Sequence, residues 1–367
     1  MIWRCDLVPQ YEAYREEIHA AIARVLPTGR YILAGEVAAF EKEFAGYIGV
    51  QHGVGVANAT DGLTLALMAL GVGPGDEVIT TPFTAIPTGS AIVDAGAKPV
   101  FVDICSDTFL MNPDKVAAAI TPRTKAIMPV HIFGNVLDVP RLRELVPAHI
   151  PIIEDASQAH GSTLDGRRAG SFADAAVFSF YPTKNLGGYG DGGAVVTNNT
   201  ELDGKLRRLR MYGMTDKDHT VTHGVNSRLD ELQAAILSVK LKHLDAMNRR
   251  RNEIAERYHR ELDPRFFIHQ RIPAGVVGNY HVFACRFRGD RAKFMAAMDA
   301  REIQTNIYYV LPLHLQKAHV ASGQKAGSLP VAEAVCHDAL ALTMYPELPD
   351  ETLTLVIRAA NECAQAL

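Results

Sequence analysis

A single lysine, Lys184, lies in the stretch FSFYPTKNLGGYGDGG (residues 178–193), between a strand-like aromatic segment and a loop that holds five glycines. A lysine with a pKa near 10.4 is only roughly one part in a thousand neutral at pH 7, so its amine becomes nucleophilic only where burial or a nearby cation lowers that pKa. Rigid backbone on both sides predicts such a positioned amine, which can form an imine with an aldehyde and then move protons. Taken alone, the loop is equally consistent with a simple turn that joins two strands.

The glycines of this loop include Gly188, Gly190 and Gly193, which match the GxGxxG pattern of dinucleotide-binding loops. That motif opens a helix, whereas the strand-like segment AVVTNN follows here, and this context excludes the dinucleotide interpretation. We expect instead that the glycines let the backbone turn tightly and approach a ligand or a neighbouring segment.

A second candidate for chemistry is Asp155, in PIIEDASQAHG (residues 151–161). It follows an apolar run at the expected carboxyl end of a strand, where an ionised carboxylate is costly unless it meets a cation. A protonated pyridine nitrogen is such a cation, and an aspartate opposite it keeps pyridoxal phosphate an electron sink through a charge-assisted bond worth about 1.5–3 kcal/mol. The alternative is that Asp155 caps the N-terminus of the next helix.

Two hydroxyl residues are candidate phosphate ligands, Ser179 and Thr60. Ser179 lies five residues before Lys184, and Thr60 lies in VANATDGLTLAL, at an expected strand-to-helix junction. Free backbone N–H groups at a helix N-terminus favour an anion without any Walker motif. The alternative for Thr60 is an ordinary helix cap.

The elements that must position these residues alternate along the chain between short apolar segments and longer helical stretches. Apolar strands separated by helices predict a buried, largely parallel sheet that helices cover on both faces. Functional groups are then expected at the carboxyl ends of the strands. The expected strands are 54–57, 77–81, 98–103, 125–130, 150–155, 175–180 and 193–197.

Beyond this sheet, one long helical stretch at 229–262 is expected to lead into a smaller α+β unit. The sequence thus predicts a large domain over residues 1–250 and a small C-terminal domain over 251–367. The smaller domain is expected to hold strands near 281–287 and 304–310 and helices near 292–300 and 330–342, while N-terminal helices near 10–25 and 37–48 pack on the large domain or on a partner subunit.

Composition narrows the class of protein. The 367 residues are 48% hydrophobic and 21% charged, as in a soluble globular protein of about two domains. The net charge of -4 gives no reason to expect nucleic acid or a membrane surface as partner. Five scattered cysteines without a CxxC pair favour reduced thiols in the cytoplasm and argue against disulfides and a metal site. The N-terminus has no signal-peptide core, and the longest nearly apolar run, 63–73, is too short to span a bilayer.

Together these stretches resemble the sugar aminotransferases of the DegT/DnrJ/StrS group. The resemblance implies an α/β fold, the fold type I of pyridoxal phosphate enzymes related to aspartate aminotransferase. It also implies pyridoxal 5'-phosphate as cofactor, glutamate as amino donor and a homodimer with a shared active site. The matching stretches are GRYILAGEVAAFEKEFAGYIGV, GPGDEVITTPFT, AGAKPVFVDI, IIEDASQAHG, FSFYPTKNLGGYGDGG, GVNSRLDELQAAIL, PLHLQ and MYPEL.

The resemblance implies that Lys184 is the Schiff-base lysine and that Asp155 is the partner of the pyridine nitrogen. It further implies a set of cofactor-binding residues: Ala156 against the ring, Gln158 at the phenolic oxygen, Ser179, Thr60 and the backbone near Ala59 and Asp61 at the phosphate, and Asn226 from the other subunit. His160 has no such role assigned, and a satisfied structural histidine is the simpler interpretation.

Three departures from the family pattern concern the substrate side. Ala85 stands where many relatives place an aromatic residue that stacks on the cofactor ring. The stretch ANAT, residues 57–60, stands where relatives have a more glycine-rich turn at the phosphate. Tyr308 stands where many relatives have a histidine near the expected substrate mouth, and His314 remains a substrate-side candidate.

The resulting hypothesis is transfer of an amino group from glutamate to a keto group of a nucleotide-linked deoxy sugar, with a lean towards a dTDP-linked 3-keto-6-deoxyhexose. A cyclitol aminotransferase that acts on a keto-inositol ring is the enzymatic alternative, because it needs the same cofactor chemistry. A non-catalytic regulatory protein on this scaffold is the other alternative. A dehydratase branch of the family replaces the lysine with histidine, so the intact Lys184 argues against it.

Overall fold

The computed structural model describes residues 1–367. Its centre is a sheet whose strands follow the order β1-β9-β8-β5, continued by β4-β2-β3. Parallel bridges between Ile127 and Ile152 and between Val130 and Asp155 join the two halves. The strands of this sheet are β1 (His52–Val56), β2 (Glu77–Thr80), β3 (Lys98–Phe101), β4 (Thr124–Met128), β5 (Ile153–Asp155), β8 (Ala175–Ser179) and β9 (Gly193–Thr197).

All seven strands expected from the sequence are present, and the sheet is mixed rather than wholly parallel. The pairs β2–β3, β2–β4 and β5–β8 are parallel, whereas β9 runs antiparallel to both β1 and β8. The reason is the connection between β8 and β9, which is the glycine-rich loop and not a helix. Parallel neighbours need a crossover of a dozen or more residues, usually helical, while a direct return gives an antiparallel pair.

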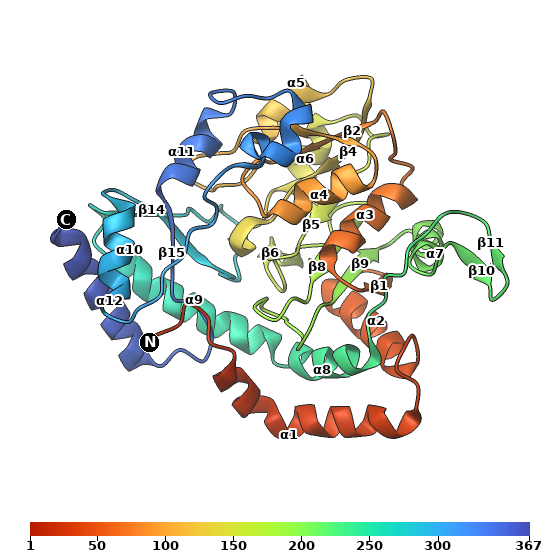
Figure 1. Ribbon diagram of the computed structural model, residues 1–367, viewed down its shortest axis with the longest axis horizontal. Helices are drawn as coiled ribbons and strands as arrows, with labels where there is room; N and C mark the ends of the chain where they lie inside the picture. The colour runs from red at the N-terminus through yellow and green to blue at the C-terminus, as the bar shows by residue number, and fades with distance from the viewer.

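Helices cover both faces of the sheet, as Figure 1 shows. On one face α3 and α7 pack with Val177 and Val195, and on the other α2 and α8 enclose Phe178 and Phe180. The fold is therefore the layered α/β arrangement that the strand pattern predicts. The helices are α1 (Val8–Val25), α2 (Gly35–Ile48), α3 (Ala59–Ala69), α4 (Ile86–Asp94), α5 (Val116–Ala119), α6 (Val139–Leu145), α7 (Thr200–Leu209), α8 (Glu231–Leu241), α9 (Leu244–Glu261), α10 (Arg291–Asp299), α11 (Pro330–Asp338) and α12 (Asp350–Gln365).

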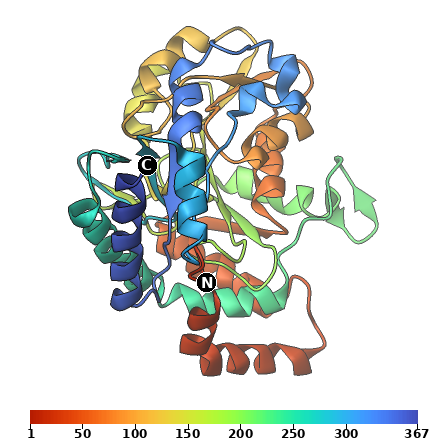
Figure 2. The same cartoon turned by 60° about the vertical axis from the view of Figure 1, so that its left-hand side comes forward.

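The long helical stretch expected at 229–262 is two helices, α8 and α9, that meet at Lys242 and His243. There the backbone N–H groups of Lys242 and His243 donate to carbonyls three residues earlier, so the chain tightens and turns. The N-terminal helix α1 lies along α8 in both Figure 1 and Figure 2 and buries Ile18, Ala21 and Val25 against it.

The C-terminal part of the chain builds a separate hydrophobic core between a small antiparallel sheet and helices α9, α10 and α12. Two sequence expectations are wrong here. Residues 304–310 form only one bridge, Asn306 to Ala341, and the expected helix 330–342 ends at Asp338, after which Ala339–Leu342 is a strand. The remaining strands are β6 (Thr163–Leu164), β7 (Arg167–Arg168), β10 (Met214–Asp216), β11 (His219–Thr220), β12 (Phe267–His269), β13 (Val276–Val277), β14 (Phe283–Phe287) and β15 (Ala339–Leu342).

One element stands apart from the layered body of the molecule. The hairpin of β10 and β11 projects away from that body in both Figure 1 and Figure 2. Among the helices, none combines the length and the apolar character needed to cross a membrane.

The start of α2 is held by one buried carboxylate, Glu231 of α8. Its two oxygens accept the backbone N–H groups of Ala34, Glu36 and Val37 at 2.7, 2.8 and 3.0 Å. We expect Glu231→Ala to lower the free energy of unfolding by about 2–3 kcal/mol, because it leaves three buried or part-buried donors at a helix N-terminus without an acceptor. Chemical denaturation measures this change, with the exposed Glu144→Ala as control; a loss no larger than that of the control would contradict the capping role.

Candidate active site

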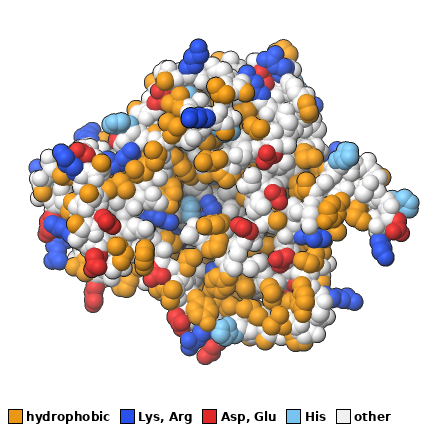
Figure 3. Space-filling view, viewed as in Figure 1, with side chains coloured by type: hydrophobic (Ala, Val, Ile, Leu, Met, Phe, Trp, Pro, Cys, Tyr) orange, Lys and Arg blue, Asp and Glu red, His pale blue; other side chains and the backbone are white.

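A cavity of about 250 Å³ opens at the centre of the molecule, where the carboxyl ends of β5 and β8 meet the N-terminus of α3. Figure 3 shows the middle of this face hollowed, with cationic side chains nearby. Most of the predicted cofactor residues share this cavity. Its lining residues are Asn58, Ala59, Thr60, Leu63, Thr84, Ala85, Pro87, Thr88, Asp155, Ser157, Gln158, Ser179, Tyr181, Lys184 and Asp191.

Lys184 enters the cavity from the loop that follows β8. The loop is tied back to the strand, because Lys184 N donates to Tyr181 O and Gly188 N donates to Phe180 O, both at 2.8 Å. Burial lowers the pKa of the Lys184 amine to about 8, although the nearby Asp155 carboxylate acts in the opposite direction. The structure therefore supplies the positioned, partly neutral amine that the sequence predicted.

The glycines of this loop are needed for close approach. A Cβ atom on Gly193 would lie 2.6 Å from the carbonyl carbon of Asn58 and 2.8 Å from Ala59 N, at the first turn of α3. A Cβ atom on Gly187 would overlap the carbonyl oxygen of Pro182. The loop can therefore fold over the cavity only with glycine at these two positions.

A second buried lysine, Lys240 of α8, supports the same loop from outside the cavity. Its Nζ donates to the Gly187 carbonyl oxygen at 2.6 Å and lies 4.7 Å from the centre of the Tyr189 ring. Gln233 adds a contact, because its Oε1 accepts from Tyr189 N at 2.8 Å. Side chains of α8 thus hold the segment that directly follows Lys184.

Asp155 closes β5 and is 4% exposed. Thr88 Oγ1 donates to its Oδ2 at 2.8 Å, and Ser157 N donates to its Oδ1 at 3.2 Å. The helix that Asp155 was alternatively expected to cap is absent, since residues 156–162 form turns. The carboxylate is thus held at the cavity wall and is not used as a helix cap.

Thr88, in α4, is a residue that sequence reasoning missed. It links Asp155 to Thr84, whose hydroxyl lies 2.9 Å from that of Thr88. The stretch FTAIPT gave a signal, because two hydroxyl residues stand four apart at the start of a helix, but the partner of Thr88 is 67 residues further along the chain.

The N-terminus of α3 forms the opposite end of the cavity. Asn58 caps the helix by accepting Asp61 N at 2.8 Å, so the N–H of Asp61 is already used. Ala59 and Thr60 occupy the first helical positions, whose N–H groups have no acceptor within the helix. With the Ser179 hydroxyl they make an anion site at a helix N-terminus. Asp61 itself does not line the cavity.

Gln158 lines the cavity with its amide held on both sides. Its Oε1 accepts Phe133 N at 2.9 Å, and its Nε2 donates to the Tyr309 hydroxyl at 3.3 Å. Tyr309 is a second residue that the sequence did not single out. Ala156 is fully buried behind the wall, in the core that contains Phe178 and Phe180.

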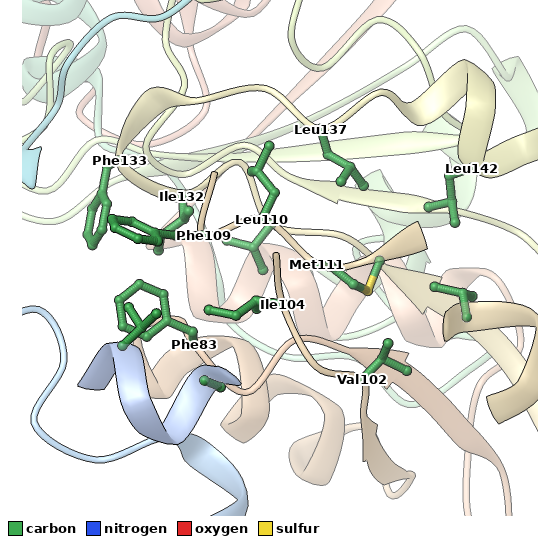
Figure 4. Packing of buried hydrophobic residues seen from close by; sticks show 14 of the residues in the cluster. Phe83, Val102, Ile104, Phe109, Leu110, Met111, Ile132, Phe133, Leu137 and Leu142 are labelled. Atoms are coloured by element: carbon green, nitrogen blue, oxygen red, sulfur yellow. The ribbon is translucent and has the colours of Figure 1, made fainter. Parts of the chain in front are cut away.

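At position 85 the cavity wall carries only the methyl group of Ala85. Aromatic side chains gather just behind it: Phe83 lies 5.8 Å from Phe109 and 5.9 Å from Phe133, measured between ring centres. Figure 4 shows these three rings pointing toward one another inside the core. These rings belong to the core, so the wall at position 85 is left with the Ala85 methyl group.

Four other candidates lie outside the cavity lining. Asn226 is exposed at the base of the projecting hairpin, and Tyr308 is half-buried beside Tyr309. His314 is buried, with Nε2 3.0 Å from Glu333 Oε1. His160 is fully buried against Phe178, and burial lowers its pKa to about 3, so the ring is neutral. Neither ring nitrogen has a hydrogen-bond partner, so the expectation of a satisfied histidine is wrong.

The cavity fits the phosphate, the aldehyde and the pyridine ring of pyridoxal phosphate. The start of α3 with Ser179 suits the phosphate, Lys184 suits the aldehyde, and Asp155 suits a protonated ring nitrogen. Asp155 forms no ion pair within the chain, and its buried carboxylate therefore suits a cation supplied by a ligand.

The lowered pKa of Lys184 predicts the pH dependence of cofactor capture. Only the neutral amine reacts with an aldehyde, so the rate of capture should rise with pH and reach half its maximum near the pKa of about 8. Rapid-mixing absorbance of the cofactor-free protein with pyridoxal phosphate measures this rate. A midpoint close to the ordinary lysine value of about 10.4 would contradict the desolvated environment.

Comparisons with known proteins agree with this geometry. Residues 12–361 match the model of the DegT/DnrJ/EryC1/StrS aminotransferase family. The chain is 45% identical to a dTDP-3-amino-3,4,6-trideoxy-alpha-D-glucose transaminase from Micromonospora megalomicea subsp. nigra, covering 98% of this chain and 97% of the other. It is 44% identical to a protein from Geobacillus stearothermophilus named pleiotropic regulatory protein, covering 97% of each.

Solved structures give the same result. The crystal structure of DesV from S. venezuelae superposes with a TM-score of 0.97 at 43% identity and covers 100% of this chain and 99% of that one. A DegT DnrJ EryC1 StrS aminotransferase from Brucella abortus superposes with a TM-score of 0.95 at 37% identity, covering 99% of each. The chain therefore belongs to the DegT/DnrJ/EryC1/StrS aminotransferase family and is a pyridoxal-phosphate-dependent aminotransferase of fold type I.

Proposed function

We propose that this aminotransferase takes the amino group of glutamate and passes it to the keto group of a nucleotide-linked deoxy sugar, in two alternating half-reactions. The observation that supports it most is the single cavity shared by Lys184, Asp155 and the N-terminus of α3. Within this class we favour a dTDP-linked 3-keto-6-deoxyhexose as the acceptor. It is supported by relatives named dTDP-3-amino-3,4,6-trideoxy-alpha-D-glucose transaminase, at 45% identity.

Each of the cavity residues has a separate role in the proposed reaction. When bound, pyridoxal phosphate supplies an electron-withdrawing ring that stabilises negative charge at the reacting carbon. Asp155 would hold the ring nitrogen protonated, and Thr88 fixes the Asp155 carboxylate. Gln158 would lie at the phenolic oxygen, and the Lys184 Nζ would carry a proton between the two carbons at which the amino group is exchanged.

We also propose a division into two domains. In this division residues 1–250 form the cofactor-binding domain and residues 251–367 the smaller domain that flanks the substrate mouth. The boundary falls within α9, and Ile2 and Cys5 pack on the core of the smaller domain. Tyr308 and His314 belong to this smaller domain and are proposed for the substrate side. His314 would act there through its pair with Glu333, because its ring is buried.

The proposed active unit is a homodimer in which Asn226 of the partner subunit reaches the phosphate. In one chain Asn226 is exposed, and the neighbouring Tyr212, Val221 and Val225 leave apolar side chains exposed beside the projecting hairpin. These features support a subunit contact at that place.

A mixing experiment tests the shared site. Lys184→Ala and Asn226→Ala proteins are each expected to be weak or inactive. After they are unfolded and refolded together, mixed dimers contain one site with an intact Lys184 and an intact Asn226, so activity should return. If the mixture stays as inactive as the two variants, Asn226 does not act across the interface.

The substrate class is tested by supplying glutamate with either dTDP- and UDP-linked 3-keto sugars or keto-inositol and measuring 2-oxoglutarate release. Amination of a sugar nucleotide supports the proposal. Turnover of keto-inositol alone would establish the cyclitol alternative, and a wild-type protein that binds the cofactor without reacting with glutamate would favour the regulatory one.

A further inference from the structure

The first four residues of the chain are held in place by hydrogen bonds to the C-terminal part of the chain. Ile2 bridges to Ile303, with Ile2 N donating to Glu302 O at 2.6 Å and Gln304 N donating to Ile2 O at 2.9 Å. Arg4 is held on both sides, because its N–H donates to Gln304 Oε1 at 3.0 Å and its carbonyl accepts Met344 N at 2.9 Å. The backbone of Arg4 therefore has a defined position.

The side chain of Arg4 leads to the cavity through a short series of contacts. Its guanidinium lies 5.3 Å from the centre of the Tyr308 ring, and Tyr308 packs edge-on against Tyr309 at 5.6 Å between centres. The Tyr309 hydroxyl accepts from Gln158, which lines the cavity. Arg4 is thus linked through Tyr308 and Tyr309 to Gln158 in the cavity lining.

The charge of Arg4 also acts on the reacting lysine. The positive charge of Arg4 lowers the pKa of Lys184, after the larger effects of burial and of Asp155. It acts in the same direction on His281, whose pKa is lowered mainly by burial. Arg4 is therefore close enough to Lys184 for the two charges to interact.

This guanidinium has no carboxylate partner within the chain. Its side-chain contact is the stacking on Tyr308, and it belongs to none of the ion pairs. Burial raises the pKa of the half-buried Glu347, and the cations that act against this rise are Arg251 and Lys240 rather than Arg4. A half-buried arginine that a ring holds in place, with its five donors unsatisfied by any acid, suits a planar anionic group of a ligand.

We propose that Arg4 binds the carboxylate of the amino-acid donor, an inference that rests on the proposed function. The donor carries its α-carboxylate on the same carbon as the amine that reacts, so that group must lie near Lys184. The phosphates of a nucleotide sugar are separated from a 3-keto carbon by ring atoms and lie further out. Arg4 is therefore a donor-binding residue, distinct from the phosphate site at α3.

Binding of unreactive ligands to the cofactor-loaded protein tests the proposal by calorimetry. The probes are glutarate, a dicarboxylate of donor size, its neutral diamide, and dTDP-glucose as a diphosphate. Arg4→Gln should raise the dissociation constant of glutarate by about tenfold or more, because a charge-assisted hydrogen-bond pair is lost. The dissociation constants of the diamide and of dTDP-glucose should stay unchanged. Arg4→Lys should keep part of the affinity for glutarate. Arg358→Gln, at an exposed site on α12, is the matched control.

Each outcome separates the alternatives. A loss confined to dTDP-glucose, or equal losses for glutarate and its diamide, would overturn the carboxylate assignment. The same holds if Arg4→Gln behaves like Arg358→Gln. If the wild type fails to react with glutamate while Arg4→Gln still weakens glutarate, the proposed donor is wrong and the carboxylate site stands. If glutamate reacts but no sugar nucleotide is aminated, the acceptor is wrong and the Arg4 result is unaffected.

Discussion

Lys184→Ala is expected to reduce turnover by at least about 10⁴-fold and to abolish covalent capture of pyridoxal phosphate. The variant removes both the nucleophilic amine and the group that moves the proton, and acid–base catalysis alone is worth roughly 10²–10⁴-fold. The measurements are steady-state turnover and the visible absorption spectrum with the cofactor, before and after glutamate is added. Retention of wild-type turnover would end the assignment of Lys184.

Lys240 is a second candidate for the reacting amine, because burial also lowers its pKa to about 8. A lowered pKa alone therefore does not choose between the two lysines. Geometry does, since Lys184 lines the cavity whereas Lys240 is 1% exposed and donates to Gly187 O.

Borohydride reduction of the cofactor-loaded protein, followed by peptide mapping, distinguishes the two lysines directly. We expect the label on the peptide that contains Lys184 and none on the peptide that contains Lys240. Lys240→Met should still be labelled at Lys184, although more slowly if the loop shifts. A label on Lys240 would contradict the assignment of Lys184 as the reacting amine.

Much of the site could be predicted because its residues lie at the ends of strongly patterned elements. Asp155 closes an apolar strand, Lys184 lies between a strand and a glycine-rich loop, and Thr60 opens a helix; each position follows from local pattern. The carboxyl ends of parallel strands then bring distant residues together, which is why the local signals pointed to one place.

What the sequence did not reveal depends on long-range contacts. Thr88 reaches Asp155 across 67 residues, and Arg4 meets Gln304 across 300. Period and propensity carry no information on such pairs. The same limit explains residues 339–342, where an alanine- and leucine-rich segment suits a helix locally but pairs with β14 in the structure.

Asp155→Asn is the second large effect that we expect, with turnover lowered roughly 10²–10⁴-fold. The amide cannot hold a proton on the pyridine nitrogen, and removal of one partner from a buried charge pair costs about 3–5 kcal/mol. The side chain is nearly the same size and can still accept Ser157 N, so folding should be preserved. The measurements are kcat and the dissociation constant of pyridoxal phosphate, with thermal unfolding of the cofactor-free protein as control.

Thr88→Val separates the charge of Asp155 from its position. Valine keeps the volume of threonine but removes the hydrogen bond to Oδ2, which is worth about 1.5–3 kcal/mol when the acceptor is charged. A fall in kcat that is clearly smaller than that of Asp155→Asn is expected, because the carboxylate remains. If Asp155→Asn turned over within tenfold of the wild type, the carboxylate would be a structural anchor for Thr88 and α4 alone. If Thr88→Val equalled Asp155→Asn, orientation of the carboxylate rather than its charge would limit the reaction.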